Sequence, residues 1–319
     1  MNSSNALSKG KMELNKMKSK DIFKSLKSDY FLQKLFNNLL KKKTLNIVKY
    51  NRNIKKRMNI NIKDYKEYSE IYSSIEIEIK PVKDEYSLFI YMNEENKIYY
   101  HIYFDNNKEE IKRNYLNKNE QIKTIKIIID YQVKSFESLF YNCDCIESIY
   151  FKKFYRNNIT NMGGMFSGCS SLKEINLNNF NTNNVTSMSE MFSGCSSLKE
   201  INFQGFSTNK VTDMNNMFNG CSALKELNLS SFNTDKVTDM NFMFYGCYSL
   251  EKINVSSFNI NKLESMNLMF CLCSSLKEIN ISDPDFSNVK YMNHMFYGCP
   301  GELKKKIKEH FDNFKEESF

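Results

Sequence analysis

The sequence predicts an α/β repeat solenoid, preceded by a small helical region and a β-rich region. The main observation is a segment with the pattern Met-Phe-x-Gly-Cys-x-x-Leu-x-x-Ile-x-Leu, which returns every 26 residues with small variations. Self-similarity at a fixed period in this range is typical of a chain in which one structural unit stacks on its own copies. Clean copies begin at Met165, Met191, Met217, Met243, Met269 and Met295, and a degenerate copy begins at Leu139.

Each copy is numbered here from its first Met as position 1, and the apolar residues at positions 8, 11 and 13 predict a strand. In the first clean copy these residues are Leu172, Ile175 and Leu177, which form the pattern Leu-x-x-Leu-x-Leu. This pattern is the strand core of leucine-rich repeats. Positions 10 and 12 are polar and lie on either side of position 11, so we expect both to point away from the core.

A second apolar group, at positions 24, 1 and 2, predicts a short helix. Met188, Met191 and Phe192 have the spacing that places side chains on one face of a helix. Thr186 fits the N-cap of this helix and Gly194 fits a left-handed C-cap. Each copy is then strand, turn, short helix and return, and the array is a leucine-rich-repeat horseshoe or rod with short helices on the convex side.

A longer pattern in the repeats resembles a known family. The run from Phe180 through Phe203 reads Phe-x-Thr-x-x-Val-Thr-x-Met-x-x-Met-Phe-x-x-Cys-x-x-Leu-x-x-Ile-x-Phe. It resembles the BspA-like leucine-rich repeat, also met as the mycoplasma-type lipoprotein repeat, and the resemblance covers about residues 125–300. The resemblance implies adhesion or protein binding, which bacterial members of the family display on cell surfaces.

Ahead of the repeats, we expect a disordered basic tail over residues 1–20 and a helical region over residues 21–64. Within the helical region, Leu32, Leu35, Phe36 and Leu39 have a spacing that resembles an F-box, near residues 30–58. This resemblance implies docking on a Skp-type adaptor of a ubiquitin ligase through these four residues. The alternative, which stays open, is a helical region that only joins or caps the array.

We expect a β-rich region over residues 65–121, the repeat array over 122–300 and a C-terminal capping helix over 301–319. Ile75, Ile77 and Ile79 alternate with charged residues, a pattern typical of a half-buried strand. Residues 87–92 and 97–104 flank a turn and predict a hairpin, and residues 125–129 predict an apolar strand. Leu303 and Ile307 begin the apolar stripe of the C-terminal helix.

Charge and composition bear on the partners and the compartment. The net charge is +8, and the excess of lysine lies in the first 63 residues while the remainder is net acidic. Arginine, which phosphate recognition tends to select, is rare, so nucleic acid is not expected as a partner. No apolar run is long enough to span a membrane, and we find neither a signal peptide nor a lipid anchor. We therefore expect an intracellular protein of the cytoplasm.

The reactive residue types form no catalytic or metal-binding pattern. Most of the nine cysteines share position 5, which predicts a reduced, buried column, with disulfides between neighbours as the weaker alternative. The pairs Cys143-x-Cys145 and Cys271-x-Cys273 lie five copies apart, too far to share one metal ion. None of the histidines belongs to a recognised catalytic motif. We predict a protein that is not an enzyme and uses no cofactor or metal.

The candidate binding site is the face formed by positions 10 and 12, called the strand face below. We predict a non-enzymatic protein–protein interaction module that binds through this face. The alternatives are an F-box-like substrate adaptor of a ubiquitin ligase and a surface adhesion protein. For the asparagines, a hydrogen-bonded structural ladder is an equal alternative to binding. The strand face consists of Glu174, Asn176, Glu200, Asn202, Glu226, Asn228, Lys252, Asn254, Glu278 and Asn280.

Overall fold

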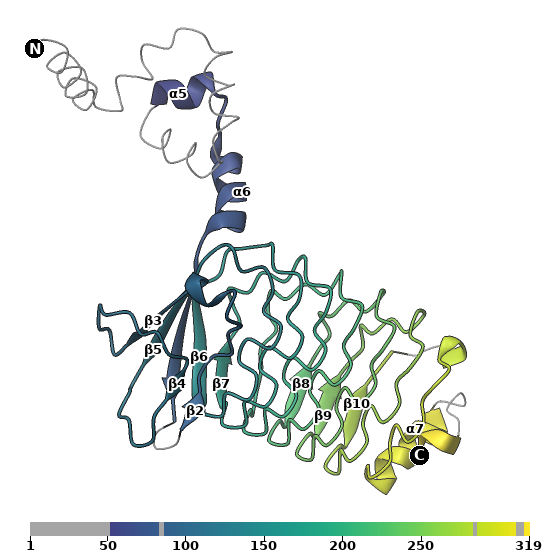
Figure 1. The fold of residues 1–319 in the computed structure, drawn as a ribbon. Coiled ribbons are helices and arrows are strands. Elements are labelled where there is room, and N and C mark those ends of the chain that lie inside the picture. Colours follow the sequence, from purple (N-terminus) through teal and green to yellow (C-terminus); the bar gives the residue numbers. More distant parts are fainter. Residues whose placement is uncertain (1–51, 83–85, 283–285, 311–315) are drawn as a thin grey trace, which may run out of the picture. The chain divides into compact units, whose positions relative to one another are not determined.

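The computed structural model describes residues 52–82, 86–282, 286–310 and 316–319 (Figure 1). By their contacts, the residues divide into two units, Met1–Tyr72 and Ser73–Phe319. The predicted basic tail lies outside the described residues, as do the docking residues Leu32, Leu35, Phe36 and Leu39. F-box-like docking therefore stays a prediction.

The described part of the first unit consists of two helices. α5 covers Arg52–Arg57 and buries Ile54, and α6 covers Ile62–Tyr72. Asn61 caps α6, because its Oδ1 accepts hydrogen bonds from the backbone N–H groups of Lys63 and Asp64, at 2.7 and 3.3 Å. The Asp64 carboxylate in turn accepts from the Asn61 N–H at 2.7 Å, and this reciprocal arrangement stabilises the start of a helix.

The second unit begins with a five-stranded sheet in the order β3-β5-β1-β6-β7. Its strands are β1 (Ile75–Pro81), β3 (Tyr100–Phe104), β5 (Ile125–Ile129), β6 (Ile146–Lys153) and β7 (Glu174–Asn176). The isoleucines of β1 are fully buried and lie opposite buried isoleucines of β5. β1 pairs antiparallel with both of its neighbours, whereas β6 pairs parallel with β7. The sheet thus passes from an antiparallel part into the repeat copies.

The predicted hairpin between residues 87–92 and 97–104 is wrong. β2 (Ser87–Leu88) pairs with β4 (Tyr115–Leu116), and β3 pairs with β5. Residues 97–99 form the 3₁₀ helix η1 (Lys97–Tyr99). Burial explains the choice of partner, because β5 offers buried isoleucines at the alternate positions where β3 also buries its side chains.

The repeat copies lie side by side along the rest of the second unit (Figure 1). β8 (Glu226–Asn228), β9 (Lys252–Asn254) and β10 (Glu278–Asn280) form a parallel sheet in the order β10-β9-β8. Ile253 lies opposite Leu227 on one side and Ile279 on the other, which is a shift of one repeat per strand. Single parallel bridges, such as Ser187 to Asp213, join the same copies along a second line.

The predicted fold class, an α/β solenoid in the form of a leucine-rich-repeat horseshoe or rod, is wrong. The regular structure is mostly sheet and is divided among sheets of five, three and two strands. A horseshoe requires one continuous row of strands, but residues 200–202 form no strand and separate β7 from β8. Within the described residues, only the 3₁₀ helices η1 and η2 (Phe286–Asn288) occur between α6 and α7 (Gly301–His310). The expected convex-side helices are therefore absent.

Backbone geometry explains why the expected helix is a run of turns. Position 26, which lies inside the predicted helix, has a left-handed φ of 56° at both Glu190 and Phe242. A left-handed residue cannot continue an α-helix. Position 4 is left-handed as well, with a φ of 72° at Gly194. Thr186, expected as an N-cap, donates instead to the carbonyl of Thr160 in the preceding copy, at 3.2 Å.

Hydrogen bonds along these turns alternate between the same copy and the next one. The Phe166 N–H donates to the Met191 carbonyl of the next copy at 2.9 Å, while the adjacent Ser167 N–H donates to the Gly164 carbonyl at 3.0 Å. In an α-helix all of these bonds would be internal. The turns therefore tie neighbouring copies together through the backbone, as a helix would not.

One phenylalanine per copy, at position 2, forms a stacked column in the core. The ring centroids of Phe192 and Phe218 are 5.7 Å apart, with 7° between the ring planes. Each ring buries its faces only between its neighbours, so the column links the stability of each copy to that of the next. The column contains Phe140, Phe166, Phe192, Phe218, Phe244, Phe270 and Phe296.

The C-terminal residues cover the end of this column. α7 buries Leu303 and Ile307, and the 3₁₀ helix η3 (Glu316–Ser318) leads to Phe319. The ring of Phe319 stacks on Phe296 with centroids 5.6 Å apart. The Phe296 N–H donates to the Ser318 carbonyl at 2.8 Å, in place of the bond that its counterparts make to a following copy. The C-terminal residues thus make the ring contact and the backbone hydrogen bond that a further copy would make.

No helix among the described residues has the length and the apolar character of a membrane span.

Candidate functional site

The structure aligns the residues of the strand face in two rows. In the three-stranded sheet, Lys252 lies opposite Glu226 and Glu278, and the asparagines at position 12 lie opposite one another. Between the rows, Leu227 and Ile253 at position 11 are buried. All members of the face are exposed except Asn254, which is half-buried. Glu174 and Asn176 lie on β7, and Glu200 and Asn202 lie in the copy without a strand.

Four of the five asparagines of the row build a turn in their own copies. The Oδ1 of Asn228 accepts a hydrogen bond from the Ser230 N–H at 3.0 Å, and the Oδ1 of Asn254 accepts from the Ser256 N–H at 3.1 Å. Asn176 and Asn202 make the equivalent bond at 3.0 and 2.8 Å. The side chain forms an Asx turn that ends the strand segment. These oxygens are therefore used within a copy and not in a ladder between copies.

The charged side chains of the face are glutamates in four copies, and Lys252 interrupts this row in the copy of β9. Lys252 Nζ lies 4.0 Å from Glu278 Oε2. At the adjoining position 9, Lys277 Nζ lies 2.6 Å from Glu251 Oε2, and this hydrogen bond lowers the pKa of the Glu251 carboxyl. The copy of β9 has Glu251 before Lys252, where the copies on either side have lysine before glutamate. The copy of β9 therefore presents charges opposite to those of the copies on either side of it.

The cysteines at position 5 form the predicted buried column, and all of them except Cys143 link two copies. All nine cysteines of the chain are free and buried. The Sγ of Cys195 donates to the Phe166 carbonyl at 3.2 Å, and the Sγ of Cys247 donates to the Phe218 carbonyl at 3.2 Å. Burial raises the pKa of the Cys221 thiol to about 12, so it is neutral at pH 7. Within the described ranges, no group of three or more His, Cys, Asp or Glu side chains could hold a metal ion.

A surface cluster on β3 surrounds His101. The His101 Nδ1 lies 3.1 Å from Glu110 Oε1, and its Nε2 lies 3.7 Å from Asp130 Oδ2. Hydrogen bonds from Lys112 and, more weakly, from His101 lower the pKa of the Glu110 carboxyl. The side chains of His101, Glu110 and Asp130 are partly exposed, so the cluster is a solvated ion-pair network. Its members are far apart in the chain, and no sequence motif marks them.

Arg156 is a buried cation that the sequence analysis did not single out. Its side chain has 0% exposure, and its Nη1 donates to the Asp130 carbonyl at 2.9 Å. Burial lowers the pKa of Arg156 to about 10 and raises the pKa of Tyr100 to about 12. The Nε and Nη2 atoms of Arg156 have no hydrogen-bond partner in the part of the chain that the structure describes. The repeat could have indicated this residue, because position 18 is a buried threonine at Thr182, Thr208 and Thr234.

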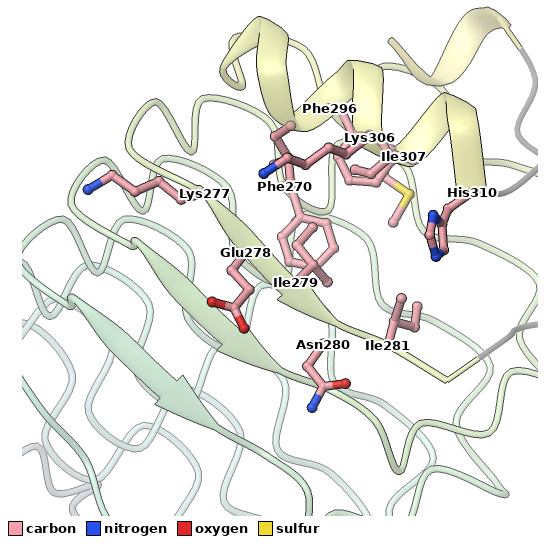
Figure 2. Close-up of a pocket in the computed structure, with 12 residues that line it drawn as sticks. Phe270, Lys277, Glu278, Ile279, Asn280, Ile281, Phe296, Lys306, Ile307 and His310 are labelled. Atoms are coloured by element: carbon pink, nitrogen blue, oxygen red, sulfur yellow. The ribbon is translucent and has the colours of Figure 1, made fainter.

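A pocket beside β10 is a second candidate site, and its volume is about 390 Å³. Figure 2 shows that side chains of β10 and α7 approach it from opposite sides. Two members of the strand face, Glu278 and Asn280, lie at the pocket, together with Lys277, Lys306 and His310. The sequence analysis missed the pocket, because it forms only where α7 folds back beside the last strand. Its apolar lining includes Phe270, Ile279, Ile281, Phe296, Leu303 and Ile307.

Comparison with known families gives a match over the repeats. A family model described as "Mycoplasma protein of unknown function, DUF285" matches residues 112–204, 134–227 and 199–310, which together cover more than half of the chain. No curated protein and no solved structure matches the chain. The F-box-like resemblance near residues 30–58 is not shown by the comparisons. The chain belongs to DUF285, the family of BspA-like mycoplasma repeat proteins, which confirms the resemblance found in the repeat pattern.

Proposed function

We propose that the chain is a non-enzymatic protein-binding module and that the strand face is its contact surface. The observation that carries the proposal is the register of β8, β9 and β10, which aligns equivalent exposed side chains from successive copies. Sites for small molecules are usually concave and mostly apolar. A row of exposed polar side chains suits an extended partner surface better, as in other stacked-repeat proteins.

The layer beneath the face supports this role, because it holds the side chains at a fixed spacing. Neighbouring strands lie about 4.8 Å apart. The phenylalanine column and the cysteine hydrogen bonds connect each copy to the next below the surface. A preorganised surface loses less conformational freedom when a partner binds, which favours affinity.

The chemistry of the face favours a polypeptide partner over a polyanion. Position 10 is glutamate in four copies and lysine in one, and position 9 has the opposite charge in each of them, so the surface is not uniformly basic. The Oδ1 atoms of Asn176, Asn202 and Asn228 are used in turns, but these exposed side chains keep their amide N–H donors. Such a mixture complements the carbonyl groups and mixed charges of another protein. The proposal requires no cofactor.

Charge reversal on the face tests the proposal. A partner cross-linked to the wild-type chain in native lysate is identified and purified, and its Kd is measured by calorimetry. We expect the double variant Glu200→Lys and Glu226→Lys to raise this Kd by about tenfold or more, as loss of matched charge does. The Tm should change little, because exposed charges contribute little to stability.

The matched control is the double variant Lys236→Glu and Lys262→Glu. Both lysines are exposed and occupy position 20 outside the strand face, and their reversal changes the net charge by the same magnitude in the opposite direction. An unchanged Kd for the face variant, or an equal loss in the control, would show that the strand face is not the contact surface.

A further inference from the structure

β10 ends its sheet and leaves a row of backbone groups open. The preceding copy shows which groups these are. The Glu251 carbonyl accepts from the Lys277 N–H at 2.9 Å, and the Val255 N–H donates to the Asn280 carbonyl at 2.8 Å. One repeat later, the equivalent groups are the Lys277 carbonyl and the Ile281 N–H, and no described residue hydrogen-bonds to either. An open edge of this kind is a template for another strand.

The side chains at this edge are also incompletely covered. In β9 and just after it, Ile253 and Val255 are only 2% and 1% exposed. Their counterparts at the edge, Ile279 and Ile281, are half-buried. The chain does not add a strand here, because it forms α7 instead, and the pocket lies between α7 and β10 (Figure 2). The position that an additional strand would occupy is therefore lined both by apolar side chains and by backbone groups without hydrogen-bond partners among the described residues.

The charge on α7 indicates which segment fits. Lys305 lies 3.8 Å from Glu309, and Lys308 lies 3.2 Å from Glu316. Lys306 is exposed at the pocket and has no ion-pair partner among the described residues. In Figure 2 its side chain extends from α7 over the opening. An acidic side chain on the bound segment would complement this cation.

We infer that this pocket binds an extended segment of a partner polypeptide, which adds as a strand beside β10. The segment places apolar side chains at alternate positions into the pocket and an acidic side chain near Lys306, and its backbone pairs with the Lys277 carbonyl and the Ile281 N–H. Strand addition of this kind obtains affinity from backbone hydrogen bonds and specificity from alternate side chains. The inference rests on the proposed function in one respect, that the ligand is a polypeptide, but it concerns the open edge of β10.

Selection from random peptides tests the inference on the full chain. Phage-displayed peptides about twelve residues long, enough to pair with a strand and extend past it, are selected on the immobilised protein. We expect enriched peptides to alternate apolar residues, to contain Asp or Glu and to lack a central proline. An enriched set without acidic residues, or no enrichment at all, would overturn the inference.

Backbone methylation of the best peptide gives a readout specific to strand pairing. Because every second N–H of a bound strand faces β10, methylation at alternate residues should abolish binding while methylation at the intervening residues is tolerated. Fluorescence anisotropy of the labelled peptide measures both. A uniform effect at all positions would exclude strand addition.

Variants of the protein then locate the site. We expect Lys306→Glu to raise the Kd of the acidic peptide by about tenfold. The same variant should bind more tightly to a version of the peptide with lysine in place of its acidic residue. Ile281→Pro removes the edge N–H and should weaken the binding of both versions of the peptide. Lys262→Glu, an exposed lysine far from the pocket in sequence, is the control and should leave binding unchanged. Equal effects of Lys306→Glu and Lys262→Glu would refute the site.

Two further outcomes separate this inference from its rivals. A second copy of the chain could pair edge to edge at β10. If analytical ultracentrifugation shows a dimer that the peptide dissociates, the natural occupant of the edge is the second copy and the inference of a separate partner is wrong. The strand-face variant Glu200→Lys and Glu226→Lys should still bind the peptide, because neither residue lines the pocket. Loss of peptide binding in this variant, with Lys306→Glu unaffected, would assign the peptide to the strand face instead.

Discussion

The Sγ of Cys221 donates a hydrogen bond to the carbonyl oxygen of Phe192 in the preceding copy, at 3.1 Å. The same oxygen accepts the Cys195 N–H of its own copy, also at 3.1 Å. A cysteine at position 5 is small enough for the core and still supplies a donor, which alanine cannot. The thiol column is therefore part of the connection between copies and more than a space filler.

Cys221→Ala should lower the free energy of unfolding by about 1–2 kcal/mol, because it removes a buried hydrogen bond and leaves a small cavity. The measurement is urea unfolding followed by circular dichroism. Cys271→Ala is the matched control: Cys271 is also buried, at 3% exposure, but its Sγ donates no hydrogen bond among the described residues. Equal losses in the two variants would show that the bond contributes nothing.

The cysteine column should also be slow to react in the folded protein. All nine thiols are free and buried, so a maleimide reagent at pH 8 should label the native chain slowly and the urea-unfolded chain completely. Reductant should leave the intact mass unchanged. A gain of two hydrogens per bridge on reduction would contradict the reduced column.

Stability should fall in alkaline solution because of the same thiols. Burial raises the pKa of both Cys221 and Cys299 from 9.0 to about 12. Below pH 9 the thiols are neutral in both states and contribute no pH dependence. Between pH 9 and pH 12 the unfolded thiol loses its proton and the folded thiol keeps it, so the free energy of unfolding decreases as pH rises.

Each such thiol contributes a slope of about 1.4 kcal/mol per pH unit in that window. Unfolding by urea at several pH values measures the slope, and comparison of wild type with Cys221→Ala isolates one thiol from the lysines and tyrosines that titrate in the same range. Parallel curves for the two proteins would contradict the burial of a neutral thiol at this site.

Asn228→Ala should lower the free energy of unfolding by about 1 kcal/mol, because it removes the acceptor of the Ser230 N–H and the Asx turn that follows β8. Asn228→Asp keeps an oxygen at the same place and should retain most of the stability. Urea unfolding of both variants measures these free energies. If alanine and aspartate are equally harmless, the asparagine row has no structural role and its exposed amides belong to binding.

Phe319→Ala should uncover the last ring of the phenylalanine column and lower stability by about 1–3 kcal/mol, since Phe319 stacks on Phe296 and is itself only partly buried. Phe319→Leu keeps apolar cover and serves as the comparison. Hydrogen exchange at the amides of His294 and Phe296 gives a local readout, because these groups donate to the Glu317 and Ser318 carbonyls. Unchanged exchange in Phe319→Ala would show that the C-terminal residues do not depend on the stacked ring.

Several features of the chain follow from its sequence alone. The period of 26 residues sets the shift between equivalent residues, so Lys252 pairs with Glu226 and Glu278. Alternation around position 11 places these side chains on the exposed face, because successive residues of a strand point to opposite sides. The same reasoning predicts a buried, reduced cysteine column. These features depend on local spacing repeated in every copy.

The turns that replace the expected helices were decided by contacts between copies. Position 26 is left-handed whether it is Gly164, Glu190, Phe242 or Leu268, so a glycine marks it in the sequence of one copy and not in these others. Hydrogen bonds between copies, such as that from the Phe166 N–H to the Met191 carbonyl, offset the strain of these left-handed residues. Because such a bond joins two copies, it cannot be inferred from the sequence of one copy.

The missing strand between β7 and β8 and the last copy of the repeats also required the tertiary structure. The period predicts a strand at residues 200–202, yet none forms there. After β10, the residues equivalent to the next strand form α7. Because α7 does not pair with β10, the edge of β10 stays open and a pocket remains between the two. Spacing along the chain determines which residues are equivalent, whereas the packing of the last copy against the C-terminal residues determines which backbone groups stay unpaired.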